Sequence, residues 1–185
     1  MINLTKLWTG VSQPADSLRY GHGHGKGHGC GMNPSAARER KPITVWNITR
    51  TCNLRCVHCY SDSAAAQYPG ELSWEQMETV VEDLAAYGVP SLLLSGGEPM
   101  IHPRFNDLVD KATELGLKLT ISTNGTLITP EMAARLKAAN VAYVGISLDG
   151  IGEIHDQFRR KEGAFDAAVR GFRNCHDAEQ KTGLR

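Results

Sequence analysis

Between residues 43 and 175 the sequence alternates short apolar runs with amphipathic helical repeats, and this alternation restricts the chain to few folds. Runs rich in β-branched residues or leucine are typical of strands buried on both faces, as in parallel sheets. Such strands are expected at 43–49, 90–95, 117–122 and 142–148. We therefore expect an α/β fold of parallel β/α units, in which a helix follows each strand.

Helix signals follow each of these runs. The first helix is expected to begin at a capping box of Ser73 and Gln76 and to end at Gly88. The third is expected to begin at Thr129, with Pro130 in its first turn. The second and fourth are indicated by apolar residues at helical spacing, namely Phe105, Leu108, Val109, Ala112 and Leu115, and Phe165, Ala168, Val169, Phe172 and Cys175. The last of these is interpreted as a small core residue.

Three cysteines follow the first expected strand: Cys52, Cys56 and Cys59. Thiolates are the usual ligands of iron–sulfur clusters, and a [4Fe–4S] cube normally takes four. With three thiolates on one loop, one iron keeps an open coordination position where a cofactor or substrate binds. The triplet therefore favours an iron–sulfur site with an open iron.

Other interpretations of these cysteines fit less well. A bacterial ferredoxin loop needs a fourth cysteine followed by proline, and a structural zinc site needs a second pair of ligands. A haem-attachment motif needs histidine after the second cysteine of a C-x-x-C pair, but Tyr60 follows Cys59. A redox pair of Cys56 and Cys59 leaves Cys52 unexplained. Thiols without a metal remain the simplest alternative.

Polar and glycine residues also follow the other expected strands. The second strand is followed by the segment 96–99, Gly-Gly-Glu-Pro, the third by 122–125, Ser-Thr-Asn-Gly, and the fourth by 147–150, Ser-Leu-Asp-Gly. Adjacent glycines let the backbone approach a ligand, and short polar side chains suit a ribose or a carboxylate. Each segment alone is also compatible with a plain turn. Because chemistry in parallel β/α folds sits at the carboxyl ends of the strands, their recurrence there indicates a site.

The spacing Cys52-x-x-x-Cys56-x-x-Cys59 resembles the signature of the radical S-adenosylmethionine (SAM) superfamily. The resemblance implies a [4Fe–4S] cluster whose unique iron binds SAM. Reductive cleavage then yields methionine and a 5′-deoxyadenosyl radical, which abstracts hydrogen from an unactivated carbon. It also implies a partial (β/α)6 barrel, with about four parallel β/α units here and a fifth strand starting near residue 183. The fourth strand would then be an open edge, so we expect poor solubility and weak activity.

The same resemblance assigns further residues to the SAM site. The segment Gly96, Gly97 and Glu98 would hold the SAM amino group, Ser147 and Asp149 would lie near the ribose, and Arg159 would pair with the carboxylate. The alternative for Arg159 is a solvated charge at a helix entry. The remaining residues expected at the site are His58 against adenine, Tyr60 lining the pocket, and the polar group Ser122, Thr123 and Asn124. His155 and Asp156 are interpreted as loop structure near the SAM site.

Composition sets further limits. Lys plus Arg and Asp plus Glu both number 20, so the zero net charge gives no electrostatic case for nucleic acid or an anionic membrane as partner. No apolar run reaches the length of a membrane span. An odd total of five cysteines is a poor disulfide framework and favours a reducing cytoplasm. We expect residues 1–40 to form an N-terminal extension with a Gly/His-rich linker at 21–31, and 41–185 a truncated radical SAM core.

Three segments, 2–7, 16–20 and 41–47, resemble the tetrapyrrole-modifying branch of the superfamily, which includes haem d1 biosynthesis enzymes and 12,18-didecarboxysiroheme deacetylase. The implied reaction is removal of an acetate side chain from a sirohaem-derived tetrapyrrole in an alternative haem pathway. It implies a small-molecule substrate and a low-potential electron donor. A radical SAM maturase acting on a peptide is the second reading, and a non-catalytic iron–sulfur or zinc-binding fragment is the third.

Overall fold

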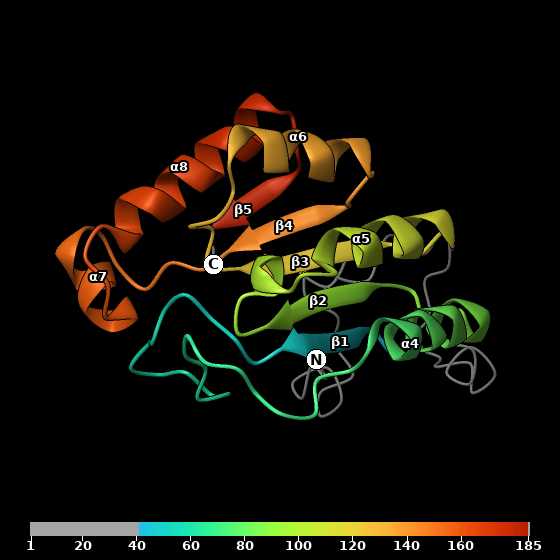
Figure 1. Cartoon of the computed structure of the whole chain (residues 1–185). Coiled ribbons are helices and arrows are strands. Elements are labelled where there is room, and N and C mark those ends of the chain that lie inside the picture. Colours follow the sequence, from blue (N-terminus) through green and yellow to red (C-terminus); the bar gives the residue numbers. More distant parts are fainter. Residues whose placement is uncertain (1–40, 185) are drawn as a thin grey trace, which may run out of the picture. The chain divides into compact units, whose positions relative to one another are not determined.

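The computed structural model describes residues 41–184, and the expected N-terminal extension with its Gly/His-rich linker lies outside this range. The described chain forms a five-stranded, wholly parallel sheet in the order β1-β2-β3-β4-β5 (Figure 1). The strands are β1 (Thr44–Thr49), β2 (Leu92–Gly96), β3 (Leu119–Thr123), β4 (Tyr143–Ile146) and β5 (Thr182–Leu184). The helices are α4 (Trp74–Tyr87), the 3₁₀-helix η1 (Pro99–Ile101), α5 (Phe105–Glu114), α6 (Pro130–Ala138), α7 (Glu153–Arg159) and α8 (Ala164–Asp177).

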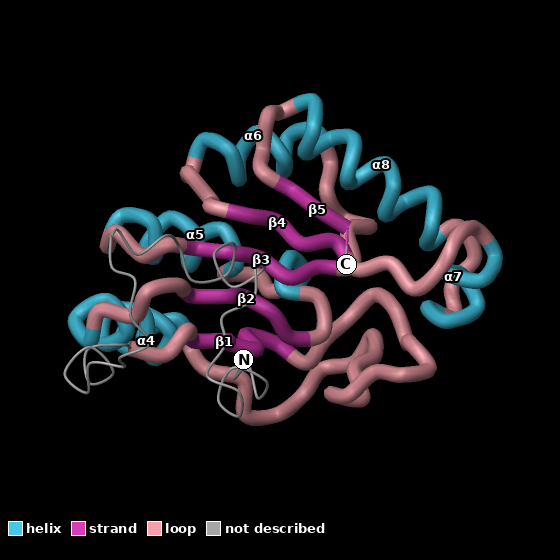
Figure 2. Tube along the Cα trace, turned by 180° about the vertical axis from the view of Figure 1, so that it is seen from behind, coloured by secondary structure: helices cyan, strands magenta, loops and turns pink. Residues whose placement is uncertain are grey.

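The long helices cover one face of the curved sheet, and the strands come to the front when the molecule is seen from behind (Figure 2). Consecutive parallel neighbours joined by right-handed crossovers place every connecting helix on the same side. Four residues that pair across neighbouring strands form one row on the face of the sheet that the helices cover. They are Trp46, Leu94, Ile121 and Val144, and each belongs to the main apolar core or packs against it. This arrangement confirms the expected α/β fold of four β/α units followed by a fifth strand.

Local helix signals are confirmed where they were expected. The Ser73 hydroxyl accepts from the Gln76 amide, and the Gln76 side chain accepts in return from the Ser73 amide. Gly88 ends α4 in the left-handed conformation, with φ of 76°. Thr129 caps α6, and Pro130 is the first helical residue. These ends form from contacts within one turn, which is why local sequence predicts them.

Two expectations about the second half of the chain are wrong. The fourth strand is not an open edge, because β5 pairs with β4 through Val144 and Thr182, Gly145 and Gly183, and Ile146 and Leu184. His155 and Asp156 lie on the short helix α7 rather than in a loop. This helix begins at Gly152 with no side-chain cap, so it lacks the signal that identified α4 and α6.

The turn after β2 packs directly on the end of β1, and this close approach predicts a large effect of a small substitution. A Cβ on Gly97 would lie 2.3 Å from the Thr51 carbonyl oxygen, so backbone must move. Gly97→Ala is expected to lower the free energy of unfolding of the apo-protein by roughly 3 kcal/mol, measured by urea denaturation. The control Gly116→Ala has open space and only a positive φ of 75°, and should cost about 1 kcal/mol. Equal denaturation midpoints for both variants would contradict this packing.

Candidate active site

The cysteine loop lies at the carboxyl end of β1 and is tied to two other parts of the chain. The amide of Cys52 donates to the Ala64 carbonyl at 2.9 Å, beside an isolated parallel bridge between Thr51 and Ala64. The amide of Val57 donates to the Phe158 carbonyl on α7 at 2.9 Å. These contacts hold the loop against both its own return segment and the helix that follows β4.

Each of the three sulfurs lies within reach of N–H donors. The nearest N–H contacts are Leu54 N to Cys52 Sγ at 3.4 Å, Arg159 Nη1 to Cys56 Sγ at 3.4 Å, and Ser63 N to Cys59 Sγ at 3.3 Å. Donors directed at sulfur stabilise thiolate and the sulfurs of iron–sulfur clusters. The donor set therefore fits the cluster that the spacing indicated.

Within residues 41–184, no three His, Cys, Asp or Glu side chains gather closely enough to hold a single metal ion.

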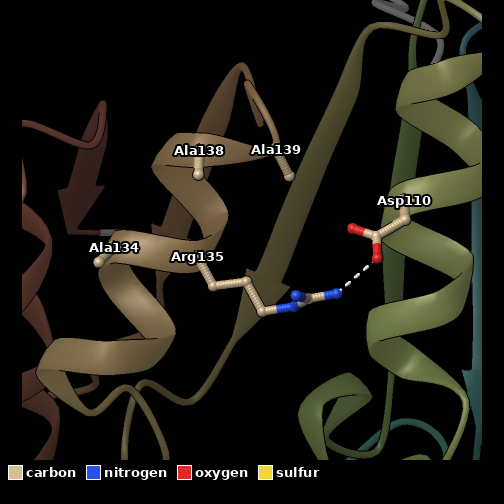
Figure 3. Close-up of a pocket in the computed structure, with 5 residues that line it drawn as sticks. All are labelled: Asp110, Ala134, Arg135, Ala138 and Ala139. Atoms are coloured by element: carbon tan, nitrogen blue, oxygen red, sulfur yellow. Dashed lines mark hydrogen bonds and ion pairs between the residues drawn. The ribbon is translucent and has the colours of Figure 1, made fainter.

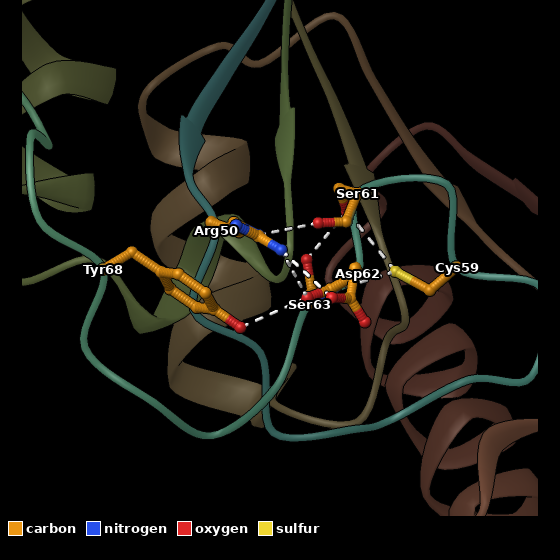
Figure 4. A network of polar contacts seen from close by, with 6 residues as sticks. All are labelled: Arg50, Cys59, Ser61, Asp62, Ser63 and Tyr68. Carbon is orange, nitrogen blue, oxygen red and sulfur yellow. Dashed lines mark hydrogen bonds and ion pairs between the residues drawn. The ribbon is translucent and has the colours of Figure 1, made fainter.

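A polar network fixes the loop after Cys59 (Figure 4). Arg50 Nε donates to the Ser61 carbonyl at 2.7 Å, and its guanidinium lies 4.5 Å from the centre of the Tyr68 ring. The hydroxyls of Ser61 and Ser63 are 2.7 Å apart, and the Ser61 hydroxyl is 3.3 Å from Cys59 Sγ. Arg50 was not expected at the site. No local motif marks it, because its partners come from a loop that folds back on it.

The thiols differ in pKa for identifiable reasons. Burial raises the pKa of Cys52 to about 11, and burial also raises that of Cys175 on α8. Burial works in the same direction on Cys59, but hydrogen bonds from Ser61 and Ser63 outweigh it and lower the pKa. Cys52 therefore holds its proton at neutral pH in the apo-protein, and a metal must displace that proton to bind.

This difference predicts the order in which the apo-protein is alkylated. At pH 8, iodoacetamide is expected to modify Cys59 at least about tenfold faster than Cys52, since the thiolate is the reactive form and the lower nucleophilicity of the more acidic thiol offsets only part of the difference. Cys175, fully buried in the core, should react slowly as well. Peptide mass spectrometry over time measures the three rates, and urea should make them similar. Equal rates at Cys52 and Cys59 in the folded protein would contradict the prediction.

Glu98 joins the ends of β2 and β3. Its side chain is fully buried and accepts from the Thr123 hydroxyl at 2.8 and 2.9 Å and from the Asn124 amide at 2.8 Å. Burial raises its pKa to about 7, although these hydrogen bonds pull in the opposite direction. The Asn124 side chain in turn donates to Asn53 Oδ1 at 2.9 Å on the cysteine loop. Three strand ends are thereby connected.

Asp149 and Arg159 connect the fourth strand end to the same loop. Asp149 Oδ2 lies 2.6 Å from Arg159 Nε, and its Oδ1 lies 3.3 Å from His58 Nε2. Arg159 Nη2 donates to the Ser147 carbonyl at 3.2 Å. Arg159 is only 7% exposed and lies in the last turn of α7, so the alternative of a solvated charge at a helix entry is wrong.

Two expected residues lie at the margin of this arrangement. Tyr60 is 78% exposed, and its hydroxyl donates to Asn47 Oδ1 at 3.2 Å. The half-exposed ring of His58 meets Phe158 edge to face, with centroids 5.7 Å apart.

The two remaining residues lie within the sheet and the core. Ser122 lies half-buried on β3. Cys175 lies in the core, which confirms its interpretation as a packing residue.

An open surface depression lies elsewhere, between α5 and α6 (Figure 3). Asp110 and Arg135 form an ion pair there at 2.6 Å, and Ala134, Ala138 and Ala139 complete the lining. Its residues come from the helices that cover the sheet, so it shares no side chain with the candidate site.

In the part of the chain that the structure describes, no helix has the length and apolar character needed to cross a membrane.

Comparison with known protein families identifies the family of this chain. The family model of the radical SAM superfamily matches residues 46–184, and the chain belongs to this superfamily. The match confirms the resemblance seen in the cysteine spacing. Members of this enzyme family use a [4Fe–4S] cluster and SAM.

Several curated relatives act in haem biosynthesis. Over all 185 residues the chain is 46% identical to the Fe-coproporphyrin III synthase of Methanosarcina barkeri, covering 46% of that protein. It is 44% identical over 145 residues (78% of this chain, 36% of the relative) to the pre-heme d1 synthase of Dinoroseobacter shibae. The resemblance to the haem-biosynthesis branch is thereby confirmed. The mycofactocin maturase MftC of Mycobacterium tuberculosis is 45% identical over 130 residues (70% of this chain, 33% of the relative). The chain thus spans less than half the length of each of these relatives.

Solved structures show the same fold. Native anSMEcpe with bound AdoMet superimposes with a TM-score of 0.64 at 26% identity, over 77% of this chain and 42% of that one. Streptococcus suis SuiB bound to S-adenosylmethionine gives a TM-score of 0.67 at 20% identity, over 77% and 33% of the two chains. The partial radical SAM barrel expected from the sequence is confirmed.

Proposed function

We propose that this chain holds a [4Fe–4S] cluster and SAM at the carboxyl edge of its sheet and cleaves SAM to start radical chemistry on a tetrapyrrole side chain. The observation that supports this most directly is the set of N–H donors directed at Cys52, Cys56 and Cys59. When bound, the cluster supplies one electron and an open iron for SAM, and the protein contributes position and shielding.

The residues around the cysteines have distinct proposed roles. The amides of Gly97 and Glu98 donate to the carbonyls of Thr49 and Thr51, so neither amide is available to a ligand. The carbonyl oxygens of this turn are proposed to accept from the ammonium group of SAM. The buried carboxylate of Glu98 holds the turn against Thr123 and Asn124 rather than facing a ligand.

The residues that follow the fourth strand provide a positive charge for the SAM carboxylate. Arg159 carries five N–H donors, of which one on Nη1 points to Cys56 and one on Nη2 points to Ser147, while Nε forms an ion pair with Asp149 without a hydrogen bond. The second N–H of each terminal nitrogen suits the SAM carboxylate, and Ser147 and Asp149 are proposed to lie near its ribose. His58 is proposed to contact adenine, and Tyr60 and Ser122 to border the pocket.

The substrate proposal follows the relatives. Identity to the Fe-coproporphyrin III synthase extends over the whole chain, whereas identity to the mycofactocin maturase covers 130 residues. We therefore favour a sirohaem-derived tetrapyrrole that loses an acetate side chain. Reduction requires a low-potential electron donor, and a reducing cytoplasm is the proposed location. The 45% identity to the maturase keeps a peptide substrate as the second candidate.

Anaerobic reconstitution with iron and sulfide tests the first step. The chain is expected to turn brown and, with dithionite and SAM, to release 5′-deoxyadenosine and methionine. A colourless, zinc-binding protein would refute the enzyme proposal and support a binding fragment.

The substrate is tested in the same mixture by mass spectrometry. Loss of acetate mass from 12,18-didecarboxysirohaem is expected. An unchanged tetrapyrrole together with SAM cleavage would contradict the tetrapyrrole proposal and favour a peptide.

A further inference from the structure

We propose that Asp149 is a positioning residue that holds the guanidinium of Arg159 against Cys56 Sγ, and that this contact raises the reduction potential of the cluster. The inference rests on the proposed function, because it requires a cluster at the three cysteines. It concerns a role of Arg159 toward a cluster ligand, in addition to its proposed role toward SAM.

The guanidinium is held from three sides. Nη1 is 3.4 Å from Cys56 Sγ, Nη2 is 3.2 Å from the Ser147 carbonyl, and Nε is 2.6 Å from Asp149 Oδ2. Burial of Arg159 to 7% exposure excludes most of the water that would compete for these donors. A planar fork with several fixed partners has little freedom to turn away from the sulfur.

Asp149 is itself fixed. Its amide donates to Nδ1 of the fully buried His155 at 3.2 Å, and its second oxygen faces His58 Nε2 at 3.3 Å. The carboxylate therefore bridges α7 and the cysteine loop. It lies beside Nε of Arg159, on the side of the guanidinium away from the Nη1 that is directed at Cys56, and we infer that this ion pair sets the orientation of the guanidinium.

A donor at a ligand sulfur favours the reduced cluster, which carries one more negative charge. Because Asp149 neutralises most of the formal charge of Arg159, the directed N–H contact is the main part of the effect rather than long-range charge. Removing the contact should therefore lower the reduction potential, whereas removing a similar charge nearby should not.

A purely structural role predicts a different result. The Asp149–Arg159 pair also closes the connection between β4 and α7, so its loss will lower stability in any case. Stability and activity alone cannot distinguish the two roles. The midpoint potential of the loaded cluster can, because a change in folding free energy does not alter it.

The test uses the reconstituted 185-residue chain in a redox titration followed by EPR without SAM. In Arg159→Gln the ratio of reduced to oxidised cluster at a fixed potential is expected to fall about tenfold, which is about 59 mV for one electron. Asp149→Asn removes a negative charge, which raises the potential, and frees the guanidinium from its position, which lowers it. In the Arg159→Gln background only the charge effect remains, so Asp149→Asn should shift the potential upward by more in that background than in the wild type.

The matched control is Arg160→Gln, which removes an adjacent, exposed arginine and the same formal charge. Its potential should equal that of the wild type. Equal shifts in Arg159→Gln and Arg160→Gln, or no shift in either, would overturn the proposal.

Arg159→Lys provides a second test in case Arg159→Gln does not bind iron, since lysine keeps the positive charge but lacks the planar guanidinium. It should load iron and shift the potential downward. Failure of every Arg159 and Asp149 variant to bind iron would also overturn the proposal, which predicts intact loading by the three cysteines. Failure of the wild type to assemble a cluster would instead refute the proposed function.

Discussion

Cys56→Ala is expected to lose the cluster and with it the cleavage of SAM. Two thiolates on a loop cannot hold a cube that leaves only one iron open, because two of its four irons would then lack a protein ligand. Iron content should fall from about four atoms per chain to a small fraction of that amount, and the brown colour should disappear. Release of 5′-deoxyadenosine should fall by far more than the roughly 10–100-fold that changes outside the ligand set cause.

The matched control is Cys175→Ala, which removes a buried cysteine from the core next to β5. It should cost roughly 1 kcal/mol in stability through the lost packing and leave iron content unchanged. A Cys56→Ala protein that stays brown and still cleaves SAM would show that another residue holds the cluster.

Glu98 is expected to make the apo-protein less stable as pH rises from 4.5 to 7. Its pKa is raised from an ordinary 4.5 to about 7, mainly by complete burial. The folded protein therefore favours the protonated carboxyl. This contribution is largest below pH 4.5, falls by about 3 kcal/mol as the unfolded chain ionises, and is constant above pH 7.

Other groups titrate over the same range, so the effect is measured as a difference. Burial lowers the pKa of His102 and His155. Their contribution to the free energy of unfolding therefore rises with pH, whereas the contribution of Glu98 falls. The free energy of unfolding of the wild type minus that of Glu98→Gln should therefore fall by about 3 kcal/mol between pH 4.5 and 7.5. The exposed control Glu114→Gln removes a carboxylate that the fold leaves in contact with water, and it measures the effect of losing a charge without burial. A flat difference for Glu98→Gln would show that the carboxylate is ionised in the fold at little cost.

Much of the fold follows from short stretches of sequence. The capping box at Ser73, the proline at the start of α6 and the leucines of β2 act within a few residues, so their patterns predict the elements within a residue or two. Helix α7 was missed because its first residue follows Gly152, which gives no side-chain cap. Its function is to bring Arg159 back to the cysteine loop.

Several contacts at the site have no local sequence signal. Glu98 accepts from residues 25 and 26 positions away, and Arg159 meets Cys56 across 103 positions. Arg50, which positions the loop after Cys59, was not expected at all. Each of these contacts depends on strand order and on how loops return, which residue spacing does not encode.

The sequence by itself determined that three thiols lie on one loop at the end of a strand, and that the chain alternates strands and helices, because both depend on spacing and periodicity. The first strand was expected to be buried, but Val45 on β1 is 49% exposed. Only the tertiary structure decided that Glu98 is buried between two strand ends and that Arg159 is directed at a sulfur. Those outcomes depend on desolvation and on contacts between distant segments, which exist only once the parallel sheet brings its strand ends to one edge.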